Sequence, residues 1–182
     1  DEIHFYDDLF NITPKRLVEI CDEIDDRGVK IKWDFRGRVN GTDYESLRRF
    51  KNSGGRMISF GIETATDEGL KVLRKGSKVK ENTQALKWCR ELGIVSVADY
   101  MIGLPHERSE QDIWDGFKVL TKQYKPDFAQ FGILSLYPNT EVYDQAVEIG
   151  PSEIERVFDE EIRLVMAGCL PRSDTFPRTL DS

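Results

Sequence analysis

Apolar residues along positions 1–150 follow two alternating spacings, one typical of β-strands and the other of α-helices. Five segments are rich in β-branched and aromatic residues and are bounded by turn residues: 2–6, 30–39, 57–62, 95–104 and 128–136. Between these segments, apolar residues recur every three or four positions, which predicts helices. The repeated order of strand and helix predicts parallel strands joined by helical crossovers.

Turn chemistry marks the ends of the predicted helices. Thr13 stands where an N-cap is expected, and Gly28 follows the last apolar residue of the same segment. Thr42 and Glu45 have capping-box spacing before the second helix. Ser109 begins a later helix in the same way. These residues place the helices between the strands.

The pattern alone leaves two folds open, an open doubly wound sheet and a TIM-like barrel. Residues 151–182 break the repeat, because one more helical segment is followed by two prolines without any periodicity. We therefore expect an α/β core at 1–150 and a C-terminal helix with an irregular tail at 151–182. The chain also begins inside a predicted strand, which suggests that the start of the natural chain precedes residue 1.

Composition narrows the classes of partner. The chain has 182 residues, of which 39% are hydrophobic and 32% charged, with a net charge of −7. This length supports a real core, and an acidic chain gives no reason to expect nucleic acid or an anionic membrane as a partner. The apolar runs are too short to span a bilayer, and no signal-peptide pattern is present. Cys21, Cys89 and Cys169 are far apart; we expect the first two to be buried free thiols, as suits a reducing cytoplasm.

Several charged and polar residues stand where the predicted strands end. Ligands of parallel α/β folds bind at this edge of the sheet. The residues at these ends are Asp7, Asp8, Arg36, Arg38, Ser59, Gly61, Glu63, Asp99, Gly103, His106 and Glu107, with 135–140 after the last strand. Carboxylates and arginines at one edge suit a zwitterion that carries a sugar. The alternative is that they are solvated loop residues.

Other chemistries receive less support. His4 and His106 are the only histidines and lack helical ligand spacing, so no side-chain metal site is predicted. The motifs GxSxG, GxGxxG and GxxxxGK[ST] do not occur. A group of lysines between two helices is interpreted as a solvated face: Lys71, Lys75, Lys78 and Lys80.

Six phrases in chain order resemble the radical S-adenosylmethionine superfamily. They are DEIHFYDDLF, KWDFRGRV, LRRFKNSGG, MISFGIET, ADYMIGLPHE and FAQFGILSLYPNTEVY. The most similar group is the cobalamin-domain-containing branch, which includes the anaerobic cyclase of the bacteriochlorophyll pathway. The resemblance covers about residues 1–150. It implies a partial (β/α)6 TIM-like barrel with parallel strands, whose first strand and cluster loop precede residue 1.

The resemblance also implies cofactors. Family members hold a 4Fe–4S cluster with the cysteines of CxxxCxxC, and the cluster binds and reductively cleaves S-adenosylmethionine to a 5′-deoxyadenosyl radical. That motif does not occur in these 182 residues, and the resemblance therefore implies that the cluster ligands lie outside this chain. Cobalamin would belong to a further domain. No catalytic residue is assigned in this chain.

The family's S-adenosylmethionine site maps onto the strand ends. Asp7 and Asp8 resemble the stretch that receives the methionine amino group, and Arg38 is similar to a residue near the methionine carboxylate. Glu63 resembles the acid that binds the ribose hydroxyls. Ser59 precedes it on the same strand and belongs to the same predicted cofactor site.

Four further residues complete the predicted site. Gly61 lies two positions before the acid, in the strand that carries it. Ile102 and Gly103 resemble the backbone segment beside the adenine. Leu136 and Tyr137 resemble the adenine-side or substrate-side wall after the last strand.

The resemblance implies an oxidoreductase or methyltransferase that acts on a small molecule, with hydrogen abstraction or methyl transfer as its chemistry. This chain alone is expected to be inactive. A non-catalytic nucleotide-binding or scaffold module on the same barrel is the main alternative, and an unrelated TIM-barrel fragment is the third. The open edge of the barrel would be covered by 151–182 or by oligomerisation.

Overall fold

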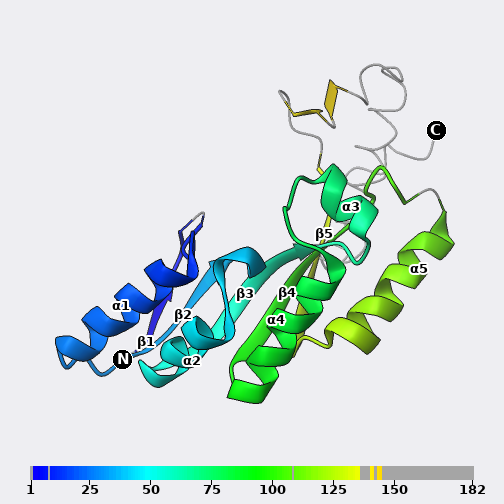
Figure 1. Cartoon of the computed structure of the whole chain (residues 1–182). Coiled ribbons are helices and arrows are strands. Elements are labelled where there is room, and N and C mark those ends of the chain that lie inside the picture. The colour runs from blue at the N-terminus through cyan, green and yellow to red at the C-terminus, as the bar shows by residue number, and fades with distance from the viewer. Residues whose placement is uncertain (1, 8, 108, 136–139, 142, 145–182) are drawn as a thin grey trace, which may run out of the picture. The chain divides into compact units, whose positions relative to one another are not determined.

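The fold is described from a computed structural model (Figure 1). The structure describes residues 2–7, 9–107, 109–135, 140–141 and 143–144. The chain divides into two compact units, Asp1–Gly132 and Ile133–Ser182. The predicted C-terminal segment 151–182, Cys169 included, lies outside the described residues.

Strands and helices alternate in the predicted order (Figure 1). The elements are β1 (Glu2–Phe5), α1 (Pro14–Asp26), β2 (Lys32–Gly37), a 3₁₀ turn (Val39–Gly41), α2 (Tyr44–Asn52), β3 (Gly55–Glu63), α3 (Asp67–Val72), α4 (Val79–Leu92), β4 (Val95–Ile102), α5 (Glu110–Val119), a π-helical turn (Leu120–Tyr124) and β5 (Phe128–Ile133). In the second unit, the backbone N–H of Tyr143 donates to the Thr140 hydroxyl at 3.3 Å. The rest of the helix predicted there is not described.

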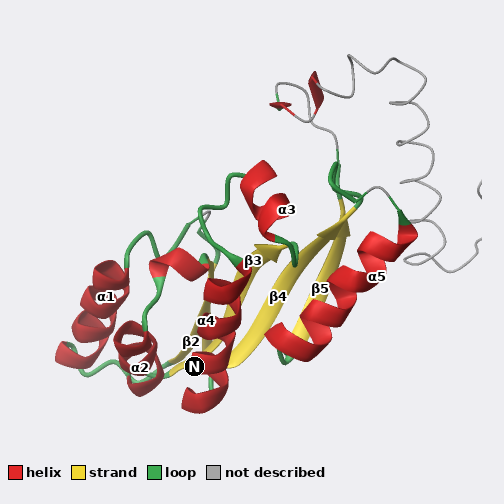
Figure 2. Ribbon diagram, turned by 45° about the vertical axis from the view of Figure 1, so that its right-hand side comes forward, coloured by secondary structure: helices red, strands yellow, loops and turns green. Residues whose placement is uncertain are grey.

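The described strands form one sheet in the order β1-β2-β3-β4-β5. Neighbouring strands from β1 to β4 are parallel, with Ile3 opposite Trp33 and Phe60 opposite Ala98. Because spatial order follows chain order, right-handed crossovers place the helices on the same face of the sheet. Figure 2 shows α1, α2, α4 and α5 along that face. The order has no reversal, so it selects the barrel type over the doubly wound sheet.

The core lies between this face of the sheet and the helices. Trp33 and Phe35 of β2 are fully buried, and the Trp33 ring centroid lies 4.6 Å from that of Phe50 in α2. Leu17 of α1 and Leu86 of α4 are also fully buried. Each such side chain contributes about 1.5–3 kcal/mol through burial. Side chains alternate along a strand, so the residues between them face the opposite side of the sheet.

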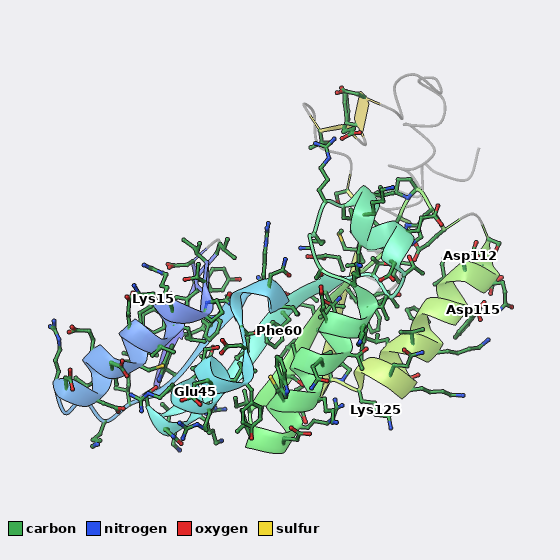
Figure 3. All side chains as sticks on the ribbon, in the orientation of Figure 1. Lys15, Glu45, Phe60, Asp112, Asp115 and Lys125 are labelled. Carbon is green, nitrogen blue, oxygen red and sulfur yellow. The ribbon has the colours of Figure 1, made fainter. Side chains whose placement is uncertain are left out.

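Charged residues on the helices point away from the core. Lys15, Glu45 and Asp115 extend outward from α1, α2 and α5 (Figure 3). Their side chains are more than half exposed. None of the described helices is long and apolar enough to cross a membrane.

The predicted caps are correct at two helices and wrong at one. Thr13 caps α1 and Ser109 caps α5, each accepting a hydrogen bond from the backbone three residues on. At α2 the cap is Asp43, which accepts from the Ser46 N–H at 2.7 Å. The Thr42 hydroxyl donates instead to the Val39 carbonyl at 2.7 Å. The helix therefore starts one residue later than the Thr42–Glu45 spacing predicts.

The thiols of Cys21 and Cys89 are free and buried, as predicted. Burial raises the pKa of Cys21, and it raises the pKa of Cys89 to about 12. Both thiols therefore stay protonated near neutral pH, and a protonated thiol is a poor nucleophile. We expect neither to be alkylated by iodoacetamide in the folded protein and both to react in concentrated urea, as read by peptide mass spectrometry. Fast modification of either thiol without urea would contradict this packing.

Candidate nucleotide site at the strand ends

A cavity of about 290 Å³ lies at the carboxyl ends of the strands. Its lining residues are Tyr6, Asp7, Arg36, Gly37, Arg38, Ser59, Gly61, Glu63, Lys75 and Asp99. The cavity therefore brings together five of the ten residues predicted for the S-adenosylmethionine site: Asp7, Arg38, Ser59, Gly61 and Glu63. Arg36 and Asp99, which were also expected at the strand ends, line it as well. A larger hollow of about 600 Å³ contains Lys32 and Gly54, at the amino ends of β2 and β3, and these ends of a parallel barrel serve stability rather than ligand binding.

The end of β3 is bent at Glu63. The pairing register with β4 shifts between Gly61 and Glu63, and Glu63 has a φ of 64°. This left-handed conformation is unusual for a residue with a side chain. The Glu63 carboxylate turns back over Gly61, where an added Cβ would lie 2.8 Å from Glu63 Oε1. The glycine therefore leaves space for the carboxylate on the strand surface.

Lys75 follows α3 and pairs with this carboxylate. Its Nζ lies 2.8 Å from Glu63 Oε1, and the side chains of Lys75 and Glu63 are 17% and 19% exposed. The interpretation of the lysine group as a solvated face is therefore wrong for Lys75. Lys71, Lys78 and Lys80 are exposed, as that interpretation predicts. Spacing along the chain could not show that the turn after α3 brings Lys75 to the end of β3.

Arg36, Ser59 and Asp99 form a network across three neighbouring strands. Arg36 Nη2 lies 2.8 Å from Asp99 Oδ2, and the Ser59 hydroxyl donates to the same oxygen at 3.0 Å. The guanidinium also lies against Tyr6, with its Cζ 5.7 Å from the ring centroid. The hydrogen bond to Asp99 raises the pKa of Arg36, which keeps its charge. Asp99 Oδ1 is buried and has no hydrogen-bond partner within the described part of the chain.

Asn11 fixes the backbone of Arg38. The amide side chain of Asn11 accepts from Arg38 N at 2.9 Å and donates to Arg38 O at 2.8 Å. Asn11 is fully buried, whereas Arg38 is exposed and its side chain forms no ion pair with any described residue. The Arg38 guanidinium is therefore available to an anionic ligand group. A lone asparagine in a loop carried no signal for this role in the sequence.

Asn11→Ala is expected to lower the free energy of unfolding by about 2 kcal/mol, because two partly buried backbone groups of Arg38 lose their partners. Urea unfolding measures the change. Asn52→Ala makes the same chemical change at the exposed end of α2 and should cost less than about 0.5 kcal/mol. Equal losses of stability in the two variants would show that the Asn11 side chain does not stabilise the backbone of Arg38.

The segment of Ile102 and Gly103 lies at the end of β4 and does not line the cavity. Gly103 has a φ of 84°, and its N–H donates to Glu107 Oε2 at 2.7 Å. Leu104 N donates to the same oxygen at 2.9 Å. Glu107 therefore fixes this backbone. Asp8, Leu136 and Tyr137 lie outside the described residues, so their predicted roles stay predictions.

The residues present fit an adenosylated amino acid better than a metal cluster. The cavity offers carboxylate oxygens for hydroxyl or ammonium groups and a free guanidinium for a carboxylate. Within the described ranges, no group of three His, Cys, Asp or Glu residues could hold a metal ion. Cys21 and Cys89 are buried in helices. Iron chemistry is therefore assigned to no described residue.

These features define a parallel α/β protein of the barrel type with a ligand cavity at its strand ends. Residues 3–115 match the model of the radical SAM superfamily. The chain belongs to this superfamily, as the six phrases predict, and therefore to a family of enzymes. The superfamily is defined by S-adenosylmethionine and a 4Fe–4S cluster, which confirms the predicted class of cofactor.

Relatives and solved structures agree with this assignment. The chain is 30% identical over 146 residues to an uncharacterized methyltransferase of Pyrococcus horikoshii, covering 80% of this chain and 31% of the relative. It is 30% identical over 144 residues to the anaerobic magnesium-protoporphyrin IX monomethyl ester cyclase of Cereibacter sphaeroides, covering 74% of this chain and 22% of the cyclase. The chain thus spans a third or less of the length of these relatives.

The fold is shared with a solved member of the superfamily. The structure of the radical S-adenosylmethionine methyltransferase TsrM from Kitasatospora setae, with cobalamin and a [4Fe-4S] cluster bound, superposes with a TM-score of 0.70 at 20% identity. The match covers 81% of this chain and 30% of TsrM. It confirms the predicted part of a TIM-like barrel, which stays open within the described residues.

Proposed function

We propose that this chain is the S-adenosylmethionine-binding core of a radical S-adenosylmethionine enzyme, with the barrel core within residues 1–150. The observation that carries the proposal is the cavity at the strand ends, where Glu63 lies beside Lys75 and Arg38 presents a free guanidinium. A ribose diol donates hydrogen bonds to a carboxylate, and a methionine carboxylate accepts them from a guanidinium. The charges of the residues that line this cavity support both contacts.

The residues of this chain would bind and orient the cofactor. Glu63 accepts hydrogen bonds from the ribose hydroxyls, and Arg38 donates to the methionine carboxylate. Asp7 and Asp8 receive the ammonium group. Residues Ser59, Gly61, Ile102, Gly103, Leu136 and Tyr137 complete the proposed site. When bound, the cluster supplies the electron that cleaves the sulfonium, and this chain provides no ligand for it among the described residues.

The reaction proposed for the complete protein is hydrogen abstraction or methyl transfer on a small molecule. Its relatives carry the names of a methyltransferase and a cyclase, and TsrM contains cobalamin. We therefore extend the proposal to cobalamin bound outside this chain. The buried, protonated thiols Cys21 and Cys89 support a reducing cytoplasm as its compartment. A second copy that pairs with an open sheet edge is the proposed oligomer.

Anaerobic reconstitution of the complete gene product with iron and sulfide tests the proposal. We expect iron uptake, and release of 5′-deoxyadenosine from S-adenosylmethionine after reduction. S-adenosylmethionine binding without iron uptake or cleavage would favour the non-catalytic nucleotide-binding module. Absence of binding, iron uptake and cleavage would overturn both functions.

A further inference from the structure

Lys75 pairs with Glu63 in the cavity but contacts no ligand group in the proposed function. Lys75 Nζ lies 2.8 Å from Glu63 Oε1 and would lie 3.2 Å from a Cβ on Gly61. The ammonium group therefore lies beside the strand surface within the cavity lining. Glu63 Oε2 forms no hydrogen bond with any residue that the structure describes. One oxygen of the carboxylate is thus held and the other is available to a ligand.

The backbone of Lys75 is fixed by the way α3 ends. Arg74 N donates to Lys71 O, and Lys75 N donates to Leu70 O, both at 3.0 Å. This pair of bonds is the Schellman motif, with Arg74 in its left-handed position at a φ of 51°. The side chain of Asn40 donates to Lys75 O at 3.4 Å. Lys75 therefore starts from an ordered turn and approaches Glu63 from a fixed direction.

We propose that Lys75 is a positioning residue for Glu63 and that it makes the cavity selective for a ligand with a vicinal diol. The inference rests on the proposed function, because it deepens the role of Glu63 in nucleotide binding. Lys75 neutralises the carboxylate and holds Oε1, which leaves Oε2 to accept from one hydroxyl. The second hydroxyl donates to the remaining lone pair of Oε1. Without Lys75 the carboxylate is an unpaired charge, free to rotate into water.

A purely structural ion pair would behave differently. Loss of such a pair lowers the stability of the protein and weakens every ligand of the cavity by the same factor. A positioning role instead couples Lys75 to the hydroxyl groups of the ligand. The coupling is measured by comparing adenosine with 2′,3′-dideoxyadenosine, which lacks both hydroxyls.

The test is calorimetric titration of the complete gene product with these two nucleosides. Lys75→Gln should weaken adenosine binding about tenfold and change the binding of 2′,3′-dideoxyadenosine less than about twofold. Lys75→Arg should restore most of the loss, since it keeps the charge. Lys80→Gln is the matched control, because Lys80 is an exposed lysine of the same cluster, and it should bind both nucleosides as the wild type does.

A second variant covers the case in which Lys75→Gln does not fold. Gly61→Ala keeps both charges but places a methyl group 2.8 Å from Glu63 Oε1 and 3.2 Å from Lys75 Nζ. Both atoms are the ends of flexible side chains, so the ion pair shifts while the fold is kept. The same selective loss of adenosine binding is expected.

The outcomes separate the two proposals. If the wild type binds adenosine better than 2′,3′-dideoxyadenosine and the Lys75 and Gly61 variants bind both nucleosides as the wild type does, Lys75 has no positioning role. If these variants weaken the binding of both nucleosides by the same factor, the ion pair is structural and the inference is wrong. If the wild type binds neither nucleoside or does not distinguish them, the role of Glu63 in the proposed function fails as well.

Discussion

Replacing Glu63 by glycine is expected to weaken the binding of S-adenosylhomocysteine about 100-fold while the protein stays folded. In the proposed site its side chain supplies the carboxylate at the ribose position, and no other described carboxylate pairs with Lys75. Loss of a charged acceptor for two hydroxyls costs on the order of 3 kcal/mol, which is a factor of about 100 in Kd. Calorimetric titration of the complete gene product measures the loss.

The backbone of Glu63 makes stability an independent readout. At a φ of 64°, glycine is relaxed and a residue with a Cβ is strained by about 1 kcal/mol. In Glu63→Gly, the stability gained by relief of this strain offsets about what is lost with the partly buried Lys75 ion pair. In Glu63→Ala, the strain remains and the ion pair is lost. We expect the glycine variant to be about 1 kcal/mol more stable than the alanine variant, with binding weakened about 100-fold in both. Wild-type affinity in either variant would remove Glu63 from the site.

Replacing Gly41 by alanine is expected to give the largest loss of stability, about 3 kcal/mol or more in the free energy of unfolding. An added Cβ at Gly41 would overlap the backbone oxygen of Asn11 and lie 2.6 Å from its side-chain nitrogen. Neither atom belongs to a flexible chain end, since Asn11 is fully buried and holds the backbone of Arg38. The loop before α1 must then move away from the end of β2.

Gly132→Ala is the matched control, because an added Cβ there meets no atom within 4 Å. Its unfolding midpoint in urea should match the wild type or exceed it slightly, through the reduced entropy of the unfolded chain. A Gly41→Ala protein as stable as this control would show that Asn11 is not packed against the 3₁₀ turn. S-adenosylhomocysteine affinity should fall with stability at Gly41 and stay unchanged at Gly132.

The sequence predicted the parts of the fold that depend on local periodicity. Trp33 and Phe35 alternate with polar residues because one face of β2 packs on the helices, and this placed the strand and its core face correctly. The position of Ser59 and Glu63 near the end of a predicted strand also placed them correctly, because both line the cavity at the strand ends. The periodicity alone did not determine the spatial order of the strands, because a regular repeat of strands and helices fits both a barrel and a doubly wound sheet. The family resemblance was needed to predict the barrel.

The parts that could not be predicted depend on contacts between distant residues. Lys75 reaches Glu63 only because α3 ends in a left-handed turn at Arg74, a position where glycine is the usual signal. Asn11 acts through a loop whose path follows from tertiary packing. The cap of α2 was misplaced by one residue because Thr42 and Asp43 are both good capping residues, and the Asp43–Ser46 box is the one that forms.

In the proposed function, the cavity at the strand ends binds the adenosyl moiety through Glu63. A crystal structure of the complete gene product with S-adenosylhomocysteine would show this contact. We expect both ribose hydroxyls within about 3 Å of the Glu63 carboxylate oxygens, with Lys75 still paired to Oε1. A ligand bound elsewhere, or a ribose that makes no contact with Glu63, would show that Glu63 does not bind the adenosyl moiety.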